Sequence, residues 1–423
     1  MKTSIRRITT SDRNSMMDSF RNDLILMVKD KILPLMGDLL YDPDNSEKKE
    51  AIREIINAGS ALIESDLTPE EIETVKEEYL FEIIGLGVVQ KLLDDREISE
   101  VMVNGIGPIF VEKHGQMYMS DVSVRSGSVL SAIVQKIRTI SGRSVDEATP
   151  MLDAHLPDHS RINIVVPPIC PSGPSITIRR PPVKMFSEEE FINFGSITKQ
   201  QANFFKNAER GRLSILVSGG TGSGKTTLLN LLSSYIPQNE RIITIQDSDE
   251  LMFEHKNIVN LLTRSQNSEG RGEVTIRMLV KNALRMHPDR IIVGEVRGGE
   301  ALDMLQAMNT GHEGSMTTLH ANGVEEAVSR LETLVLMSGL DLPSKAIKQQ
   351  ISYALHLIVQ ISKQPNGRRF VSDVRELVGI DGDRILTNQI FNANAEQVGD
   401  LTERTKKHAL TYGVADIWGY NQE

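Results

Sequence analysis

The chain has 423 residues and a formal net charge of −10 at pH 7, so its length predicts two or three domains and its acidic balance argues against sequence-independent binding of DNA or RNA. Cys170 is the only cysteine, which excludes an intrachain disulfide and a thiolate zinc site and fits a reducing cytosol. Because no apolar run approaches the roughly 18–20 residues of a membrane span and the basic N-terminus lacks the apolar core of a secretory signal, we expect a cytoplasmic protein with at most peripheral membrane association.

Composition along the chain predicts a helical N-terminal extension, a small α/β domain and a larger α/β domain. Residues 1–75 are polar and helical in pattern, and Thr68-Pro69 is typical of a helix start with proline in the first turn. Over residues 79–182, short β-rich runs alternate with a helix near 129–140. The prolines at 181 and 182 indicate a linker over 180–183, and residues 183–423 form the third region.

The third region contains a P-loop between an apolar strand at 213–217 and a helical start at 227–232. The loop reads Gly219-Gly220-Thr221-Gly222-Ser223-Gly224-Lys225-Thr226, and Thr227 follows it. Its glycines let backbone N–H groups turn toward phosphate oxygens, and the helix N-terminus adds partial positive charge. We expect Lys225 to reach the β- and γ-phosphates and Thr226 to supply a hydroxyl to Mg²⁺. The chain is therefore predicted to bind ATP or GTP.

Acidic residues follow two apolar segments of this region, each predicted to be a buried strand. The segment 241–245 leads into Gln246, Asp247 and Glu250, and the segment 290–293 leads into Glu295. In open α/β sheets, polar groups at the carboxyl ends of strands lie beside a bound phosphate. We expect Glu295 to hold Mg²⁺ through water or to orient the attacking water, with Asp247 and Glu250 assisting. The alternative is that these acids are ordinary surface turn residues.

Within residues 311–322, His312 and His320 flank a short segment that is rich in serine and threonine. A metal site is disfavoured, because no cysteine or carboxylate lies at ligand spacing. We expect a strand that senses the γ-phosphate by hydrogen bonding, with His320 in the catalytic set. Buried and satisfied polar side chains are the structural alternative.

The C-terminal part is predicted to hold helices at 324–337 and 344–354, followed by strands at 355–361 and 369–380 that are added late to the core sheet. In the first helix, Leu331, Leu334 and Val335 recur at helical spacing, as does Val328. The polar stretch 399–423 contains the lone Trp418, to which the sequence assigns no role.

The motifs Arg290–Arg297, Glu300–His312 and Thr317–Asn322, in that order, resemble the type II/type IV secretion ATPase superfamily. The similarity covers about residues 80–380 and is closest to the CpaF/TadA branch, which powers tight-adherence (Tad or Flp) type IV pili. It implies a RecA-like P-loop ATPase domain after a smaller α/β domain. In that reading Lys225 and Thr226 belong to the Walker A motif, Glu295 is the Walker B glutamate, and 246–250 and 311–320 are the Asp box and the His box.

The resemblance also implies a homohexameric ring that hydrolyses ATP and couples rotation of its domains to an inner-membrane platform protein, without direct contact with nucleic acid. Extension and retraction of the filament both stay open. ATP would lie between the two domains, with Arg143, Arg161 and Arg179 reaching its phosphates; each arginine could instead pair with a nearby acid. The other assignments are a conjugative, type IV or type II secretion motor, and a regulatory nucleotide-binding subunit.

Two positions depart from the family pattern. Gln246 stands where the Asp box usually has glutamate, and an amide cannot accept a proton as a general base. His155 stands where arginine is common, which lowers the positive charge expected at the nucleotide. Both departures predict slower turnover without loss of nucleotide binding.

Overall fold

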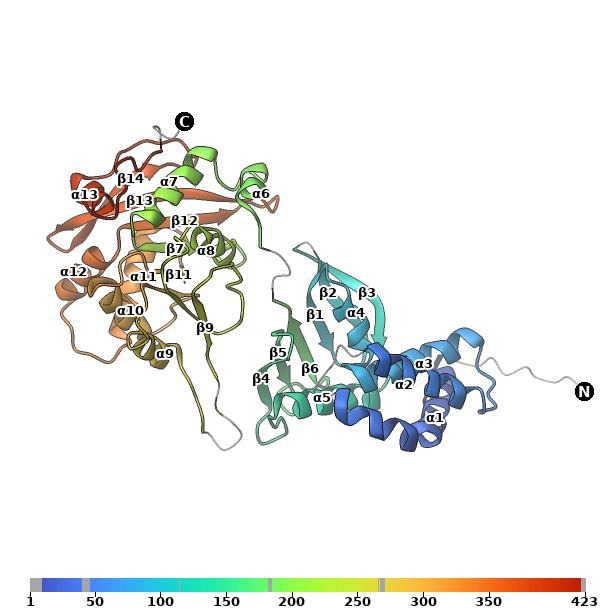
Figure 1. Ribbon diagram of the computed structural model, residues 1–423. Coiled ribbons are helices and arrows are strands. Elements are labelled where there is room, and N and C mark those ends of the chain that lie inside the picture. Colours follow the sequence, from blue (N-terminus) through green and yellow to red (C-terminus); the bar gives the residue numbers. More distant parts are fainter. Residues whose placement is uncertain are drawn as a thin grey trace, which may run out of the picture. The chain divides into compact units, whose positions relative to one another are not determined.

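The computed structural model describes residues 10–39, 46–113, 115–181, 185–264, 266 and 271–419. The chain forms two compact units, Met1–Pro181 and Pro182–Glu423, and each is described by itself (Figure 1). Residues 182 and 183 of the predicted linker lie outside the described residues. No helix within the described ranges is both long enough and apolar enough to cross a membrane.

The first unit begins with a bundle of helices α1 (Thr10–Leu39), α2 (Ser46–Ser60) and α3 (Pro69–Ile84) around a shared apolar core. Helix α3 starts where the sequence predicts: the Thr68 side chain accepts from the backbone of Glu71, whose carboxylate accepts from the Thr68 backbone in return. It continues past residue 75, the predicted end of the helical region, because Tyr79 and Ile83 extend the buried stripe of the helix.

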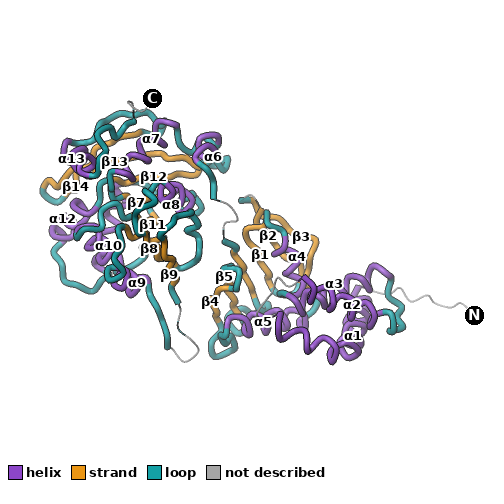
Figure 2. The backbone as a smooth tube through the Cα atoms, viewed as in Figure 1, coloured by secondary structure: helices purple, strands orange, loops and turns teal. Residues whose placement is uncertain are grey.

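The rest of this unit is an antiparallel sheet in the order β3-β2-β1-β6-β5-β4. Its strands are β1 (Ile98–Asn104), β2 (Gly107–Lys113), β3 (Gln116–Val124), β4 (Met151–His155), β5 (Arg161–Val165) and β6 (Ser175–Arg179), and its helices are η1 (Gly87–Val89), α4 (Gln90–Asp94) and α5 (Gly127–Ser141). Alternate residues of β1, β5 and β6 are buried and pack with the apolar stripe of α5 in one core. Figure 2, in which strands are orange and helices purple, shows that the α1–α3 region is entirely helical.

Half-buried polar contacts join the bundle to the sheet domain. Lys136 of α5 donates from Nζ to the carbonyls of Glu82 at 3.1 Å and Ile83 at 2.7 Å, which are among the last carbonyls of α3. Arg125 forms an ion pair with Glu78 of the same helix. Burial lowers the pKa of Lys136 and raises that of Glu78. The helical region is thus attached to the sheet domain through the end of α3.

The second unit has one sheet in the order β14-β13-β12-β7-β11-β10-β8-β9, with helices on both faces. Its strands are β7 (Ile215–Gly219), β8 (Ile242–Gln246), β9 (Ile258–Leu262), β10 (Arg290–Val293), β11 (Met316–His320), β12 (Leu357–Lys363), β13 (Arg369–Asp381) and β14 (Arg384–Phe391). Its helices are α6 (Glu188–Asn193), α7 (Lys199–Arg210), α8 (Lys225–Ser234), α9 (Ile276–Ala283), α10 (Glu300–Asn309), α11 (Val324–Leu336), α12 (Ser344–Ala354) and α13 (Glu403–Thr411). The strands from β12 to β9 are parallel, so the fold is the expected RecA-like α/β fold.

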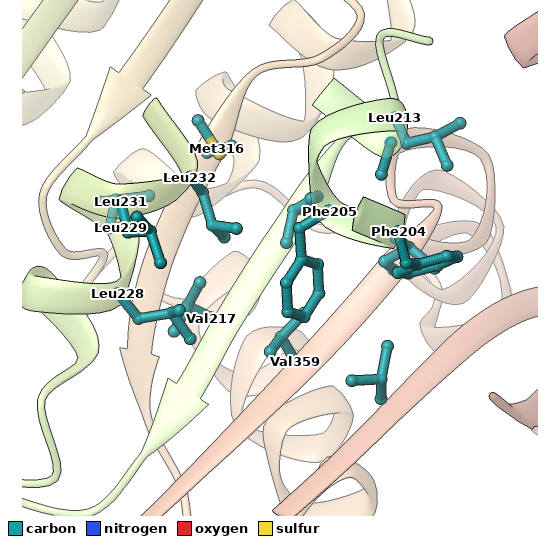
Figure 3. Close-up of a cluster of buried hydrophobic side chains, with 14 of the residues drawn as sticks. Phe204, Phe205, Leu213, Val217, Leu228, Leu229, Leu231, Leu232, Met316 and Val359 are labelled. Atoms are coloured by element: carbon teal, nitrogen blue, oxygen red, sulfur yellow. The ribbon is translucent and has the colours of Figure 1, made fainter. Parts of the chain in front are cut away.

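Apolar clusters cover both faces of this sheet, which explains why its central strands read as continuous apolar runs. Ile215 and Val217 of β7 face the cluster that contains α7 and α8, whereas Leu216 faces the cluster that contains α9 to α12. Figure 3 shows part of the first cluster, in which phenylalanines of α7 and leucines of α8 pack over β7 and β12.

The C-terminal part agrees with the predicted helices but not with the predicted place of the first strand. Strand β12 pairs in parallel with β7, so it belongs to the centre of the sheet, and only β13 and β14 are antiparallel additions. Trp418 has a packing role that the sequence did not predict: its ring stacks on Phe204 at 5.1 Å and lies 6.0 Å from Phe391. It thereby holds the C-terminal segment against helix α7.

Candidate functional site

The P-loop connects β7 to α8 at the carboxyl edge of the parallel sheet. Strand β7 ends at Gly219, and residues 220–224, which include Thr221 and Ser223, form the turn. The first turn of α8 consists of Lys225, Thr226 and Thr227. Gly222 and Gly224 have φ angles of 67° and 98°, which a side chain would strain. These backbone angles account for the glycines at those positions. The loop leads directly into the N-terminus of α8, whose free N–H groups can bind an anion.

The Lys225 side chain lies inside the loop. Its Nζ donates to the carbonyls of Gly219 at 3.1 Å and Gly220 at 3.0 Å, and lies 3.1 Å from Nδ1 of His320. Burial lowers the pKa of this amine, and the charge of Glu295 opposes that effect. The ammonium is therefore positioned at the edge of the sheet where the expected phosphates would bind, with partners that a phosphate can replace.

A chain of contacts runs from Lys225 along the ends of neighbouring strands. His320, at the end of β11, places Nε2 3.2 Å from Oε1 of Glu295, which follows β10. Arg297 donates to Oε2 of Glu295 at 2.9 Å and to Oδ2 of Asp247 at 3.3 Å. Because β7, β11, β10 and β8 are consecutive in the sheet, the predicted residues Lys225, His320, Glu295 and Asp247 meet at one edge.

His320 is neutral in this arrangement. A lysine ammonium can only donate, so Nδ1 of His320 accepts from Lys225 and the ring hydrogen is on Nε2, which lies 3.2 Å from Oε1 of Glu295. Burial lowers the pKa of His320, and the nearby positive charges of Lys225 and Arg297 lower it further, whereas the negative charge of Glu295 raises it. The ring can thus transmit a change at Lys225 to the carboxylate of Glu295.

Other polar groups of the His box have structural roles, as the alternative interpretation of the sequence held. His312 lies before β11, at the other end of the strand from His320, and its Nδ1 is 3.3 Å from the carbonyl of Ala307. The Ser315 hydroxyl donates to the His312 carbonyl at 2.7 Å, and Thr318 Oγ1 donates to the Gly294 carbonyl at 2.7 Å.

Gln246 is bound within its own turn, and its effect on turnover stays a prediction. The side chain is 3% exposed, and its Oε1 accepts from the backbone N–H groups of Glu250 at 3.0 Å and Leu251 at 2.9 Å. Its Nε2 donates to Asp249 at 3.0 Å. Gln246 therefore helps to shape the turn after β8, where its side chain serves as both acceptor and donor. Glu250, which follows in that turn, is half-buried.

The residues expected to hold Mg²⁺ are of a suitable kind. Thr226 is half-buried in the first turn of α8, and its hydroxyl makes no hydrogen bond to another described residue. The Ser223 hydroxyl is buried and also lacks a partner among the residues that the structure describes. A threonine hydroxyl and a nearby carboxylate such as Glu295 suit Mg²⁺, which keeps several waters and binds together with substrate phosphates.

The arginines predicted to reach the phosphates lie together in the first unit. Arg161 and Arg179 are paired across β5 and β6, and His155 is paired with Arg161 across β4. Arg161 binds the carboxylate of Asp153 at 3.1 and 2.6 Å, and Arg143 donates to the Asp153 carbonyl. Arg179 lies 3.7 Å from Glu100. Each therefore has an acidic or carbonyl partner within its own unit, and contact with a nucleotide stays a prediction.

Residues that sequence reasoning missed complete the site. Arg297 joins Glu295 to Asp247, and Thr263, which follows β9, donates to Oδ1 of Asp247 at 3.0 Å. Arg369, at the start of β13, donates from Nε to the P-loop carbonyl of Gly222 at 2.9 Å. The available sequence signals were weak: Arg297 closes a motif whose glutamate alone was assigned, and Arg369 lies 143 positions after Thr226 in the sequence (369 − 226).

A family model described as "Type II/IV secretion system protein" matches residues 82–395, a range that includes the P-loop and the contact chain. A putative conjugal transfer protein of Mycobacterium tuberculosis is 34% identical over 321 residues, which are 74% of this chain and 90% of that protein. The conjugal transfer protein TrbB of Rhizobium radiobacter is 34% identical over 296 residues, 69% of this chain and 86% of TrbB. The VirB11 ATPase of the Brucella suis type IV secretion system, a crystal structure, is 30% identical with a TM-score of 0.37, over 68% of this chain and 95% of that one.

Proposed function

The chain belongs to the type II/IV secretion system protein family, and from this premise we propose that it is an ATP-hydrolysing motor that powers assembly of a Tad/Flp-type pilus. The observation that carries the proposal is the contact chain from Lys225 through His320 to Glu295. It joins the group that would bind phosphate to the acid that would act on water. The CpaF/TadA resemblance of the motifs at 290–322 favours the pilus over other cargoes.

In the proposed reaction, water attacks the γ-phosphorus of ATP, the bond to the β–γ bridging oxygen breaks, and ADP and phosphate are released. Glu295 orients the water and takes its proton, and Lys225 stabilises the charge on the phosphate oxygens. Mg²⁺, held by Thr226 and through water by Glu295, would supply further positive charge to the phosphates. Asp247 and Glu250 stay as supporting acids at the same edge.

Binding of the nucleotide would rearrange the contact chain. To bind phosphate, Lys225 must exchange the carbonyls of Gly219 and Gly220, and its contact with His320, for phosphate oxygens. His320 then loses the donor at Nδ1 while its Nε2 stays beside Glu295. We propose that through this exchange the binding of the γ-phosphate changes the contacts of Glu295 and, through Arg297, those of Asp247.

The mechanical part of the proposal follows the resemblance. Six copies form a ring at the cytoplasmic face of the inner membrane, and Arg143, Arg161 and Arg179 contact the ATP from the first unit. Hydrolysis rotates the units, provided that their arrangements bind ATP and ADP with different affinity. A platform protein in the membrane receives the motion.

A second candidate function is a motor for conjugal transfer or type IV secretion. The names of the similar Mycobacterium tuberculosis and Rhizobium radiobacter proteins favour it. The site chemistry would be the same, so the cargo decides between the two. Deletion of the gene would remove surface pili under the first proposal, and would leave pili intact but stop DNA or protein transfer under the second.

Steady-state ATP hydrolysis by the full chain with Mg²⁺, measured together with its oligomeric mass, tests the motor. We expect Lys225→Ala to lose ATP binding, and Glu295→Gln to bind ATP while its turnover falls by at least about 100-fold. Glu254→Gln, which changes an exposed glutamate in the segment after β8, is the control and should hydrolyse ATP like the wild type. Unchanged turnover in Glu295→Gln would remove its catalytic role, and absence of ATP binding by the wild type would refute the proposal.

A further inference from the structure

The hairpin between β12 and β13 lies at the edge of the sheet that carries the P-loop. Strand β12 runs parallel to β7, and Ile361 is paired with Gly219, the last residue of β7. The chain therefore continues past the start of the P-loop through Lys363 before it returns in β13, whose first residue, Arg369, is paired with Lys363. This topology brings Arg369 beside a loop that is distant in the sequence.

Arg369 contacts the P-loop on its outer side. Its Nε donates to the carbonyl of Gly222 at 2.9 Å. Its aliphatic stem lies over Gly224: a Cβ atom on that glycine would lie 3.3 Å from Cδ of Arg369. Glycine at 224 thus permits both the positive φ angle of the loop and the close approach of this arginine.

The neighbouring Arg368, which precedes β13, provides a comparison because its side chain binds a different part of the unit. Arg368 donates from its guanidinium to the carbonyl of Gly195 at 3.0 Å, after helix α6, and lies over the ring of Phe370. The two arginines are adjacent in the same exposed hairpin and each binds one glycine carbonyl. Of these two arginines, Arg369 is the one that binds the P-loop.

We propose that Arg369 is a positioning residue of the nucleotide site, which holds the P-loop in the conformation that binds the β-phosphate; this inference rests on the proposed ATPase function. A loop with glycines at 219, 220, 222 and 224 has many conformations to lose on binding. A charge-assisted hydrogen bond to the Gly222 carbonyl removes part of that freedom before the nucleotide arrives. Since the β-phosphate is common to ATP and ADP, the affinity for both nucleotides should depend on Arg369 equally, and the chemical step should not.

The test is equilibrium binding of fluorescent ATP and ADP analogues with Mg²⁺ to the full chain, together with kcat at saturating ATP. We expect Arg369→Ala to raise the Kd for both nucleotides about tenfold, the loss expected for a hydrogen bond to a charged group, with kcat within about twofold of wild type. Arg369→Lys, whose amine can donate to the same carbonyl, should recover most of the affinity. Arg368→Ala is the matched control and should leave both Kd values unchanged.

Wild-type affinity in Arg369→Ala, an equal loss in Arg368→Ala, or a fall in kcat without a change in Kd would each overturn the inference. The melting temperatures of the two alanine variants show whether either change unfolds the hairpin, in which case Arg369→Lys decides. If the wild type binds ATP through Lys225 while Arg369→Ala is unaffected, only this inference fails. If the wild type does not bind ATP, or Lys225→Ala binds it normally, the proposed function fails as well.

Discussion

The strand that delivers Glu295 begins at a buried ion cluster, and we predict that loss of its central arginine destabilises the second unit far more than loss of one of its acids. Arg290, the first residue of β10, is 0% exposed and binds Glu240 through Nε at 2.6 Å and Glu209 through NH1 at 2.8 Å. Arg212 adds contacts to Glu240 at 3.4 Å and Asp289 at 3.0 Å.

The magnitude follows from charge and burial. Arg290→Met leaves the buried carboxylate of Glu240 without its central cation and the buried Glu209 side chain without its donor, a change that costs about 3–5 kcal/mol. That is a large part of the roughly 5–15 kcal/mol by which a domain is stable. Glu209→Gln should cost much less stability, because it removes one negative charge from a cluster that has an excess of them. The cluster of Arg290, Arg212, Glu209, Glu240 and Asp289 has a net charge of −1 when fully ionised (2 − 3).

Glu209 is the acid that resolves this excess charge. It is 0% exposed and its Oε1 has no partner among the described residues. Burial raises the pKa of Glu209 from 4.5 to about 8, because desolvation outweighs the attraction of Arg290. Between about pH 4.5 and 8, the folded form therefore keeps a proton on Glu209 that the unfolded form has already released. The free energy of unfolding falls as pH rises through this window, by up to about 1.4 kcal/mol per pH unit. Glu209→Gln should lack this slope.

The lone tryptophan supplies the assay. Trp418 stacks on Phe204 of α7, the helix that also carries Glu209, so its fluorescence reports on unfolding of this unit. Urea unfolding from pH 5 to 8 would compare wild type, Arg290→Met and Glu209→Gln, with Arg285→Met, an exposed arginine, as control. Equal pH slopes for wild type and Glu209→Gln would refute the assigned proton, and a loss below about 1 kcal/mol in Arg290→Met would refute the central role of the arginine.

The remaining predictions concern the site. Gln246→Glu should not raise ATP turnover and should lower the melting temperature, because it sets a carboxylate against Asp249, to which Nε2 now donates at 3.0 Å; faster hydrolysis would contradict this reading. Burial lowers the pKa of His320 from its ordinary value of 6.5, so turnover should be flat from pH 8 to 6.5 and should fall only at lower pH, where the protonated ring would pair with Glu295 and weaken it as a base. The same acid limb in His320→Gln would show that another group titrates.

Local sequence was sufficient for the parts of the site that local geometry builds. A strand, a glycine-rich turn and a helix start are consecutive in the chain, so the P-loop and the position of Lys225 could be predicted from residues 213–232. The same holds for Glu295 and Asp247, because each follows its own buried strand. That these acids share one edge follows from parallel pairing, which the apolar strands indicated.

What the sequence alone determined is therefore the chemistry of the second unit: a nucleotide loop, acids after strands, and the family to which they belong. Only the tertiary structure decided which groups touch. The strand order sets His320 between Lys225 and Glu295, and a parallel β12 brings Arg369 to the P-loop. Gln246 turned out to be bound within its own turn. Side-chain partners depend on hydrogen bonds between strands far apart in the chain, and no local pattern encodes those pairings.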